Sequence, residues 1–286
     1  MIHPFEYVAP TRLEDALAFL RRHEPDARIL AGGTDLLIAM RERGLKPACL
    51  VDIKRIDGLS TVAVDTAGYL TLGALVSVRD VERSPLVRER FPILASAAGM
   101  LASVQVRNKA TIGGNICNAS PAADLAPPLL VLDATATAVG PGGERSIPIA
   151  ALFAGPGRTI LQGEILTGFS VPALAARSRA VYLKHGPRNA MDIAIVGVAV
   201  LARLDPRGET WEEVRIGLGS VAPTPIRVPE AERALRGAAA GPEAIARAAD
   251  MAAEEARPIS DVRGSADYRR AIVRSLVRRA LEGVSS

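Results

Sequence analysis

Cysteine is scarce in this chain, whose 286 residues include only Cys49 and Cys117. Neither has a Cys or His neighbour at metal-ligand spacing, which argues against a disulfide framework, a zinc site or an iron–sulfur cluster carried by this chain. The three histidines, His3, His23 and His185, are scattered, and no H-E-x-x-H, G-x-S-x-G or P-loop motif occurs. A hydrolase therefore has little support, and we expect any metal chemistry to come from other chains.

Aromatic residues make up 3% of the chain, and its 35 basic and 31 acidic residues are interspersed, with a net charge of +4. Nucleic-acid surfaces usually combine a basic stripe with stacking rings, so nucleic-acid binding is not expected. The longest nearly unbroken apolar run, residues 193–202, is about half of the ~20 residues that cross a bilayer. The N-terminus lacks a basic segment followed by an apolar core, and we therefore expect a cytoplasmic protein without a membrane span.

The length predicts about two domains, each able to bury its own core. Strand, helix and strand patterns follow one another over residues 28–53, which is typical of a parallel crossover. A buried helix rich in Ala and Leu is predicted over residues 92–103. A composition shift at residues 172–177 indicates a domain boundary, after which strand-like runs lead into three helical stretches, predicted over residues 229–235, 242–255 and 266–281.

The last helical stretch, residues 266–281, has an apolar face that includes Leu276 and Ala280. Two interpretations of its arginines stay open, a solvated face or a surface for a partner. These arginines are Arg269, Arg270, Arg274 and Arg278.

Two Gly-Gly segments are the strongest functional signal, at residues 31–35 (AGGTD) and 111–115 (TIGGN). Paired glycines allow positive φ and close backbone approach, so successive N–H groups can converge on a diphosphate without lysines. Each segment adjoins a predicted helix start, where the helix dipole favours an anion. We expect Thr34 to cap the first helix and Ser120 to cap the second.

A single Gly-Gly segment is weak evidence for a binding site, because most such segments only form a turn. Together with nearby hydroxyl, amide and carboxylate groups, the two favour a ligand that has both phosphate and ribose-like oxygens. These polar side chains belong to Thr34, Thr111, Asn115, Asn118 and Asp124. An ordinary capping role stays open for Asp124, which follows Ser120 at the N3 position of the predicted helix.

Five ordered motifs extend along nearly the whole chain. They are AGGTDLL from Ala31, TIGGNICNASPAADL from Thr111, KHGPRNAMDIAIV from Lys184, GLGSVAPTPIR from Gly217 and DVRGSADYRR from Asp261. Together they resemble the FAD-binding medium subunit of molybdenum hydroxylases, the relatives of carbon monoxide dehydrogenase and xanthine dehydrogenase.

The resemblance implies an α+β fold with two domains. Residues 1–175 would form a p-cresol methylhydroxylase-type FAD-binding domain with α/β subdomains of about 1–56 and 57–175. Residues 176–286 would form a C-terminal domain of antiparallel sheet with helices.

The resemblance also implies which residues contact FAD. Those matched to the family's motifs are Ala31, Gly32, Gly33, Thr34, Asp35, Leu36, Thr111, Ile112, Gly113, Gly114, Asn115, Asn118, Asp124, Ile165, Leu166 and Lys184. The two glycine segments would bind phosphate and ribityl groups, and Ile165 or Leu166 would form an apolar wall beside the flavin ring. Lys184 would stabilise the anionic reduced flavin; the alternative is a surface lysine at a strand end.

In such complexes a large subunit holds the molybdenum cofactor, and a small subunit carries [2Fe-2S] clusters. The resemblance implies that this chain accepts electrons from the clusters and passes them from FAD to an external acceptor. It also implies an assembly of the three subunits as a dimer of heterotrimers. FAD supplies the chemistry, so no catalytic side chain is expected here. Cys117 is interpreted as a packing residue, with a redox role as the alternative. A free-standing flavin oxidase and a non-enzymatic subunit that has lost flavin are the competing functions.

Overall fold

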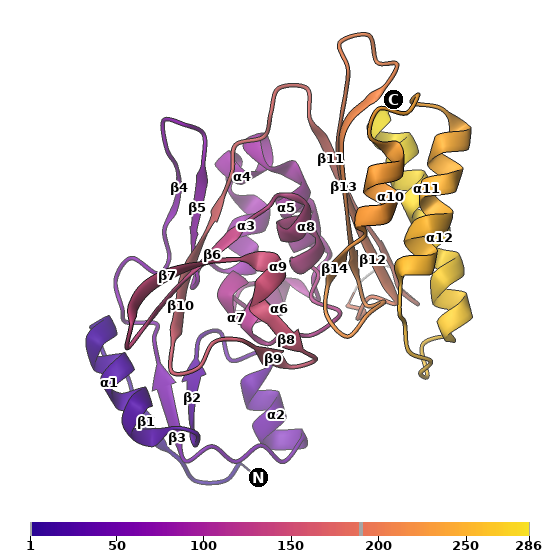
Figure 1. Ribbon diagram of the computed structural model, residues 1–286. Helices are drawn as coiled ribbons and strands as arrows, with labels where there is room; N and C mark the ends of the chain where they lie inside the picture. Colours follow the sequence, from indigo (N-terminus) through magenta and orange to yellow (C-terminus); the bar gives the residue numbers. More distant parts are fainter. Residues whose placement is uncertain (1, 189–190, 286) are drawn as a thin grey trace.

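A three-stranded parallel sheet begins the fold, with the strand order β1-β3-β2 (Figure 1). The computed structural model describes residues 2–188 and 191–285. The elements of this first region are β1 (Glu6–Val8), α1 (Leu13–His23), β2 (Ala27–Leu30), α2 (Leu36–Glu42) and β3 (Cys49–Asp52). Strand β2 pairs with β3 in parallel, with Ala27 opposite Cys49. This pairing confirms the crossover predicted over residues 28–53, and Ala16 and Leu20 of α1 pack into the core beside the sheet.

A five-stranded antiparallel sheet of the order β4-β5-β10-β6-β7 forms the centre of the molecule. Its strands are β4 (Val62–Val64), β5 (Leu70–Gly73), β6 (Thr135–Gly140), β7 (Gly143–Pro148) and β10 (Ile165–Val171). Side chains alternate along β6, where Ala136 and Ala138 are buried and the residues between them are half-buried. The sheet therefore has one face in the largest core of the protein.

Short helices cover this central sheet (Figure 1). They are α3 (Val78–Arg83), α4 (Pro85–Arg90), α5 (Pro92–Met100), α6 (Val104–Arg107), α7 (Ile112–Cys117), α8 (Ala126–Val131) and α9 (Ile149–Leu152), and a small hairpin of β8 (Phe153–Gly155) and β9 (Arg158–Thr159) follows them. Five of the nine residues of α5 are buried, and every residue of α8 is buried. The buried helix predicted over residues 92–103 is therefore confirmed, although it ends at Met100.

The C-terminal part is a four-stranded antiparallel sheet with three helices on one face (Figure 1). Its elements are β11 (Arg179–His185), β12 (Val196–Leu204), β13 (Trp211–Gly219), β14 (Ile226–Arg227), α10 (Pro229–Leu235), α11 (Pro242–Glu255) and α12 (Ala266–Ser285). Along β12, Val198 and Val200 pack with these helices, whereas Ala199 and Leu201 pack into the central core. Both faces of β12 are thus buried, and the α+β fold with an antiparallel C-terminal sheet is as the sequence predicted. Residues 189 and 190 of the third motif lie outside the described residues.

One arginine of α12 is not part of a solvated face. The side chain of Arg269 is 2% exposed and donates to the carbonyl oxygens of Ile195 (2.8 Å) and Ser220 (3.1 Å) and to Asp261 (2.7 Å). Hydrogen bonds from Arg263 and then from Arg269 hold the pKa of Asp261 well below its usual range. The expectation that Arg269 lies on the surface was wrong. Its buried charge is compensated by partners outside the helix, which the periodicity of the helix does not reveal.

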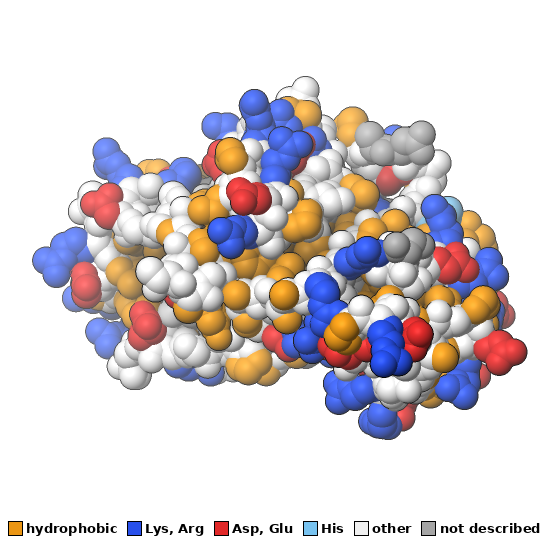
Figure 2. All heavy atoms as spheres, turned by 90° about the horizontal axis from the view of Figure 1, so that it is seen from above, with side chains coloured by type: hydrophobic (Ala, Val, Ile, Leu, Met, Phe, Trp, Pro, Cys, Tyr) orange, Lys and Arg blue, Asp and Glu red, His pale blue; other side chains and the backbone are white. Residues whose placement is uncertain are grey.

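Charged side chains of both signs are interspersed with hydrophobic ones on the face seen in Figure 2. Among the described residues, no helix combines the length and the apolar character needed to cross a membrane.

Candidate functional site

The first glycine segment joins β2 to α2 and leaves a row of backbone donors unpaired. Within residues 2–188 and 191–285, the N–H groups of residues 32–36 have no hydrogen-bond partner. Gly33 has a φ of +74°, a conformation that L side chains rarely adopt. Consecutive unpaired N–H groups at a helix start form an anion-binding cradle.

The cap of this helix lies one residue later than predicted. Asp35, not Thr34, occupies the N-cap of α2, and neither side chain closes a cap hydrogen bond. The first turn instead begins with the N–H of Leu37, which donates to the carbonyl oxygen of Gly33 at 3.1 Å. The side chains of Thr34 and Asp35 are therefore not used by the helix that they precede.

The second glycine segment forms the first turn of α7 rather than a loop. Thr111 is the N-cap, and its Oγ1 accepts a hydrogen bond from the N–H of Gly114 at 3.0 Å. The N–H of Gly113 donates to the carbonyl oxygen of Ala74 at 2.9 Å, and the N–H of Ile112 donates to Val76 at 3.0 Å. This turn is consequently fixed to the chain that follows β5.

Ser120 does not cap a helix, which corrects the expectation from its sequence context. Its Oγ accepts from the N–H of Ala122 at 3.2 Å, and its carbonyl oxygen accepts from Ala123 at 3.0 Å, so only a single turn forms. Helix α8 begins later, at Ala126, with Leu125 at its N-cap and proline in its first turn. The prolines that start α8 set the helix boundary, and the segment before it is left irregular.

The first glycine segment touches the chain that leads into the second. A Cβ atom on Gly32 would lie 1.9 Å from the carbonyl oxygen of Lys109 and 3.0 Å from the Cα of Ala110, just before Thr111. Only glycine permits this contact, because both neighbouring atoms belong to the backbone and cannot rotate away. The structure therefore joins residues from two separate stretches of sequence into one polar surface.

Side-chain amides lie on this surface without full partners. Asn115 is half-buried, and its Oδ1 is buried with no hydrogen-bond partner among the described residues. Asn118 is exposed and ends α7. Buried polar atoms are nearly always hydrogen-bonded, so an orphaned Asn115 oxygen is suited to a ligand donor. Burial raises the pKa of the neighbouring Cys117 thiol to about 12, consistent with a packing role.

Asp124 and Lys184 form a buried ion pair. The carboxylate of Asp124 accepts hydrogen bonds from Lys184 Nζ and from Tyr182 Oη, each at 2.8 Å. Lys184 Nζ also donates to the carbonyl oxygen of Met100 at 3.1 Å. The side chains of Lys184 and Asp124 are 9% and 7% exposed. The surface-lysine alternative for Lys184 and the capping alternative for Asp124 were therefore wrong.

Burial governs the ionisation of this cluster. It raises the pKa of Asp124, while Lys184 and Tyr182 oppose that rise. It also raises the pKa of Tyr182 well above 10, and the Asp124 charge adds to the effect. Tyr182 therefore acts as a neutral hydroxyl donor that, with Lys184, fixes the segment after α7 to strand β11.

The predicted apolar wall lies in the protein interior. Ile165 and Leu166 are 0% and 4% exposed and begin β10. They belong to two different cores: Ile165 packs with the first region and Leu166 with the central one. A flavin-contacting role for either side chain stays a prediction.

Lys54 is a residue of this neighbourhood that sequence reasoning missed. Its Nζ donates to the carbonyl oxygen of Ala31 at 3.2 Å and pairs with the carboxylate of Asp52 at 2.7 Å. Asp52 also accepts from Tyr7 Oη at 2.6 Å. A signal existed, because Lys54 lies two residues after the end of the parallel strand β3, and such strand ends meet at one edge of the sheet.

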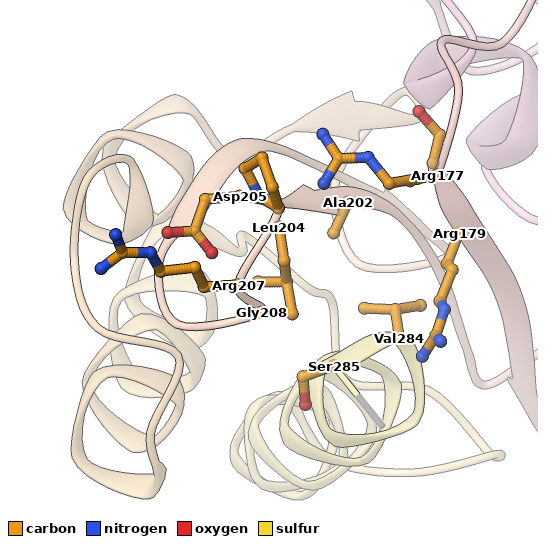
Figure 3. A pocket seen from close by; sticks show the side chains of 11 residues that line it. Arg177, Arg179, Ala202, Leu204, Asp205, Arg207, Gly208, Val284 and Ser285 are labelled. Atoms are coloured by element: carbon orange, nitrogen blue, oxygen red, sulfur yellow. The ribbon is translucent and has the colours of Figure 1, made fainter.

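A cavity of about 560 Å³ lies away from the glycine segments, in the C-terminal part of the chain (Figure 3). It is bounded by the chain entering β11, the turn after β12 and the end of α12. Leu204 and Val284 lie between the side chains of Arg179 and Arg207 (Figure 3). Its volume would suit a small ligand, but its lining contains none of the predicted flavin residues. The glycine segments, not this cavity, are the candidate site.

Two family models match the chain. Residues 3–174 match the FAD binding domain in molybdopterin dehydrogenase, and residues 181–284 match the CO dehydrogenase flavoprotein C-terminal domain. The carbon monoxide dehydrogenase medium chain of Hydrogenophaga pseudoflava is 38% identical over 283 residues, covering 98% of this chain and 97% of the relative. The xanthine dehydrogenase FAD-binding subunit of Escherichia coli O157:H7 is 31% identical over 277 residues, covering 96% and 94%.

Solved structures show the same similarity. A chain of carbon monoxide dehydrogenase from Hydrogenophaga pseudoflava, in a form lacking the Mo-pyranopterin moiety of the molybdenum cofactor, superposes with a TM-score of 0.95 at 38% identity. That match covers 99% of this chain and 97% of the other. A chain of quinoline 2-oxidoreductase from Pseudomonas putida 86 gives a TM-score of 0.92 at 29% identity, covering 100% and 98%.

Proposed function

Because the chain belongs to the family of FAD-binding medium subunits of molybdenum hydroxylases, we propose that it is the FAD-carrying electron-transfer subunit of such a complex. It accepts electrons from the [2Fe-2S] clusters of a partner and delivers them to an external acceptor. The chain is thus one component of an oxidoreductase, and the bound FAD supplies the redox chemistry.

The contact of the first glycine segment with the chain leading into the second carries this proposal. Gly32 lies against the backbone just before Thr111, so the unpaired N–H groups of residues 32–36 adjoin the start of α7. These groups would bind the diphosphate of FAD, since they supply donors without needing a lysine cluster. The orphaned Oδ1 of Asn115 would accept a hydrogen bond from a ligand hydroxyl. The donor set therefore fits a dinucleotide that carries both phosphates and sugar hydroxyls.

Asp124 and Lys184 would support the site as a fixed pair. Their charges compensate each other, and Tyr182 holds the same carboxylate. Lys184 is therefore oriented by its partner before any ligand binds, and less of its charge is available than for an isolated lysine. We retain Ile165 or Leu166 as the apolar wall, on the ground that both start β10 between the two cores.

The names of the relatives describe chains of larger enzymes, such as a medium chain and an FAD-binding subunit. This favours a subunit over a free-standing flavin oxidase. We propose a large partner with the molybdenum cofactor and a small partner with the iron–sulfur clusters, assembled as a dimer of heterotrimers. We place the domain boundary near residue 175, supported by the two model matches that end at 174 and begin at 181. The cytoplasmic location stays a prediction that cell fractionation would test.

Flavin occupancy tests the proposal directly. The purified chain is supplied with FAD and desalted, and its absorption spectrum and released cofactor are measured. We expect one FAD per chain in the wild type and none in Gly114→Val, whose new side chain would occupy the space beside the cap. A Cβ at Gly114 meets only Thr111 Oγ1 within 4 Å, at 2.9 Å, so the fold should survive.

Gly142→Val is the matched control, because a Cβ there meets nothing within 4 Å. It should bind FAD like the wild type. Full occupancy in a folded Gly114→Val would refute the assigned site, and a folded wild-type chain that binds no FAD even with its partner subunits would refute the function.

A further inference from the structure

Three potential metal ligands from distant parts of the sequence meet at one end of the first sheet. Glu6 is the first residue of β1, and Cys49 is the first residue of β3. The two strands are parallel neighbours, with Glu6 directly opposite Cys49 in the register. His23 is the last residue of α1, the helix that connects β1 to β2. The meeting is therefore fixed by regular elements rather than by loops.

The ligand atoms of these residues converge. One nitrogen of His23, the thiol sulfur of Cys49 and one carboxylate oxygen of Glu6 lie within 4.8 Å of one another. The thiol of Cys49 donates a hydrogen bond to Glu6 Oε2 at 3.7 Å. Cys49 is 3% exposed, whereas His23 is half-buried and Glu6 is exposed. A cation could thus reach the buried sulfur from the solvent side, past the carboxylate.

The hydrogen bond of His23 leaves one of its ring nitrogens available to a metal. Its Nδ1 lies 2.9 Å from the carbonyl oxygen of Phe19, one turn earlier in α1. A carbonyl can only accept, so Nδ1 carries the hydrogen and Nε2 keeps its lone pair free. Metal-binding histidines usually have their second nitrogen engaged in this way. The ring also stacks on Phe19 with centroids 4.1 Å apart, which restricts its rotation.

We propose that Glu6, His23 and Cys49 form a binding site for a zinc ion, separate from the flavin site. A thiolate, an imidazole and a carboxylate are the three ligand types that zinc accepts in proteins. Water would take the fourth position on the exposed side next to Glu6. The ion would link the ends of α1, β1 and β3, where the Cys49 thiol already donates a hydrogen bond to the Glu6 carboxylate.

Binding requires only an exchange of a proton for the metal. The S–H bond of Cys49 breaks, its proton passes to solvent, and a zinc–sulfur bond forms with no change of oxidation state. Sequence spacing gave no indication of this site, because the ligands are not close in the chain. The pairing of β1 with β3 places them together.

Zinc binding to the full-length chain tests the inference. The FAD-treated protein is freed of metals with a chelator, dialysed and titrated with Zn²⁺, and bound zinc is measured by equilibrium dialysis. We expect one zinc ion per wild-type chain, and binding at least about tenfold weaker in His23→Gln and in Cys49→Ser. Cys117→Ser, which alters the other cysteine, should bind zinc like the wild type.

Two further measurements guard against a folding artefact. Co²⁺ replaces Zn²⁺ as a spectroscopic probe, and a sulfur-to-cobalt charge-transfer band should appear in the wild type and in Cys117→Ser but not in Cys49→Ser. Zinc should raise the unfolding temperature of the wild type and leave that of His23→Gln unchanged. The inference is overturned if the wild type binds no zinc, or if the His23→Gln and Cys49→Ser variants bind it equally well. Flavin content plays no part in these readings, so they are independent of the proposed function.

Discussion

The two glycine segments have the same Gly-Gly pair but use it in opposite ways. In the first segment, Gly32 is wedged against the backbone of Lys109, and the N–H groups around it stay unpaired. In the second, Gly113 is packed against Ala74, whereas a Cβ on Gly114 would meet only the Thr111 hydroxyl within 4 Å. In the first segment, Gly32 permits close packing and the N–H donors stay available. The second segment is a capped helix turn in which only the capping hydroxyl lies close to Gly114.

Glycine is required at these positions for two different reasons, close backbone packing and a positive φ, which the sequence motif alone does not distinguish. Gly32 and Gly113 are needed because other backbone lies too close for a side chain. Gly33 is needed because its φ of +74° is unfavourable for L residues. At Gly114 the φ is ordinary and a Cβ would meet only a side-chain atom, Thr111 Oγ1 at 2.9 Å, so no nearby backbone requires glycine there and a ligand would be a further reason for it. Substitutions at matched positions of the two segments should therefore differ in how much they lower the stability of the fold.

The largest effect is expected for Gly32→Ala. The new Cβ would lie 1.9 Å from the carbonyl oxygen of Lys109, so one of the two backbone segments must move. We expect the free energy of unfolding to fall by about 3 kcal/mol. Urea denaturation measures it, with Gly142→Ala as a control that should stay within about 0.5 kcal/mol of the wild type. An unchanged midpoint for Gly32→Ala would show that the segments are not in contact.

The second-largest difference is expected between two acidic residues, Asp124, which follows the second segment, and Asp35 of the first. Asp124→Asn leaves the buried Lys184 without its counter-charge, and we expect a loss of about 2 kcal/mol in the free energy of unfolding. Asp35→Asn alters an exposed carboxylate and should change stability by less than about 0.5 kcal/mol. Both variants are compared in the same denaturation assay. Equal effects would mean that the Asp124–Lys184 pair contributes no more than a surface charge.

The smallest difference in stability is expected between substitutions of the two threonines, Thr111 and Thr34. Thr111→Val removes the oxygen that accepts from the N–H of Gly114, and the lost cap should cost about 1 kcal/mol. Thr34→Val removes a hydroxyl that closes no cap and should have no comparable cost. Thermal unfolding of the two variants side by side would decide this. A larger loss for Thr34→Val would reverse the assignment of the caps.

Much of the fold was visible in the sequence because it depends on local patterns. The helices Pro229–Leu235 and Pro242–Glu255 begin and end at the predicted residues, each with proline in its first turn. The parallel crossover was predicted from the order of its elements. The predicted caps Ser120 and Thr34 were wrong because several neighbouring residues could each start a helix. Helix α2 has its N-cap one residue later, at Asp35, and α8 begins only at its prolines.

The sequence by itself determined the family, the α+β class and the two glycine segments, since each is carried by residues close together in the chain. Tertiary structure alone decided which of these residues meet. The contact of Gly32 with Lys109, the pairing of Asp124 with Lys184 and the burial of Arg269 all join distant stretches. The Glu6, His23 and Cys49 cluster is another case. Such contacts depend on how strands pair and cores pack. Hydrophobic periodicity predicts which face of a helix or strand is buried, but it does not predict which residue of another element packs against that face.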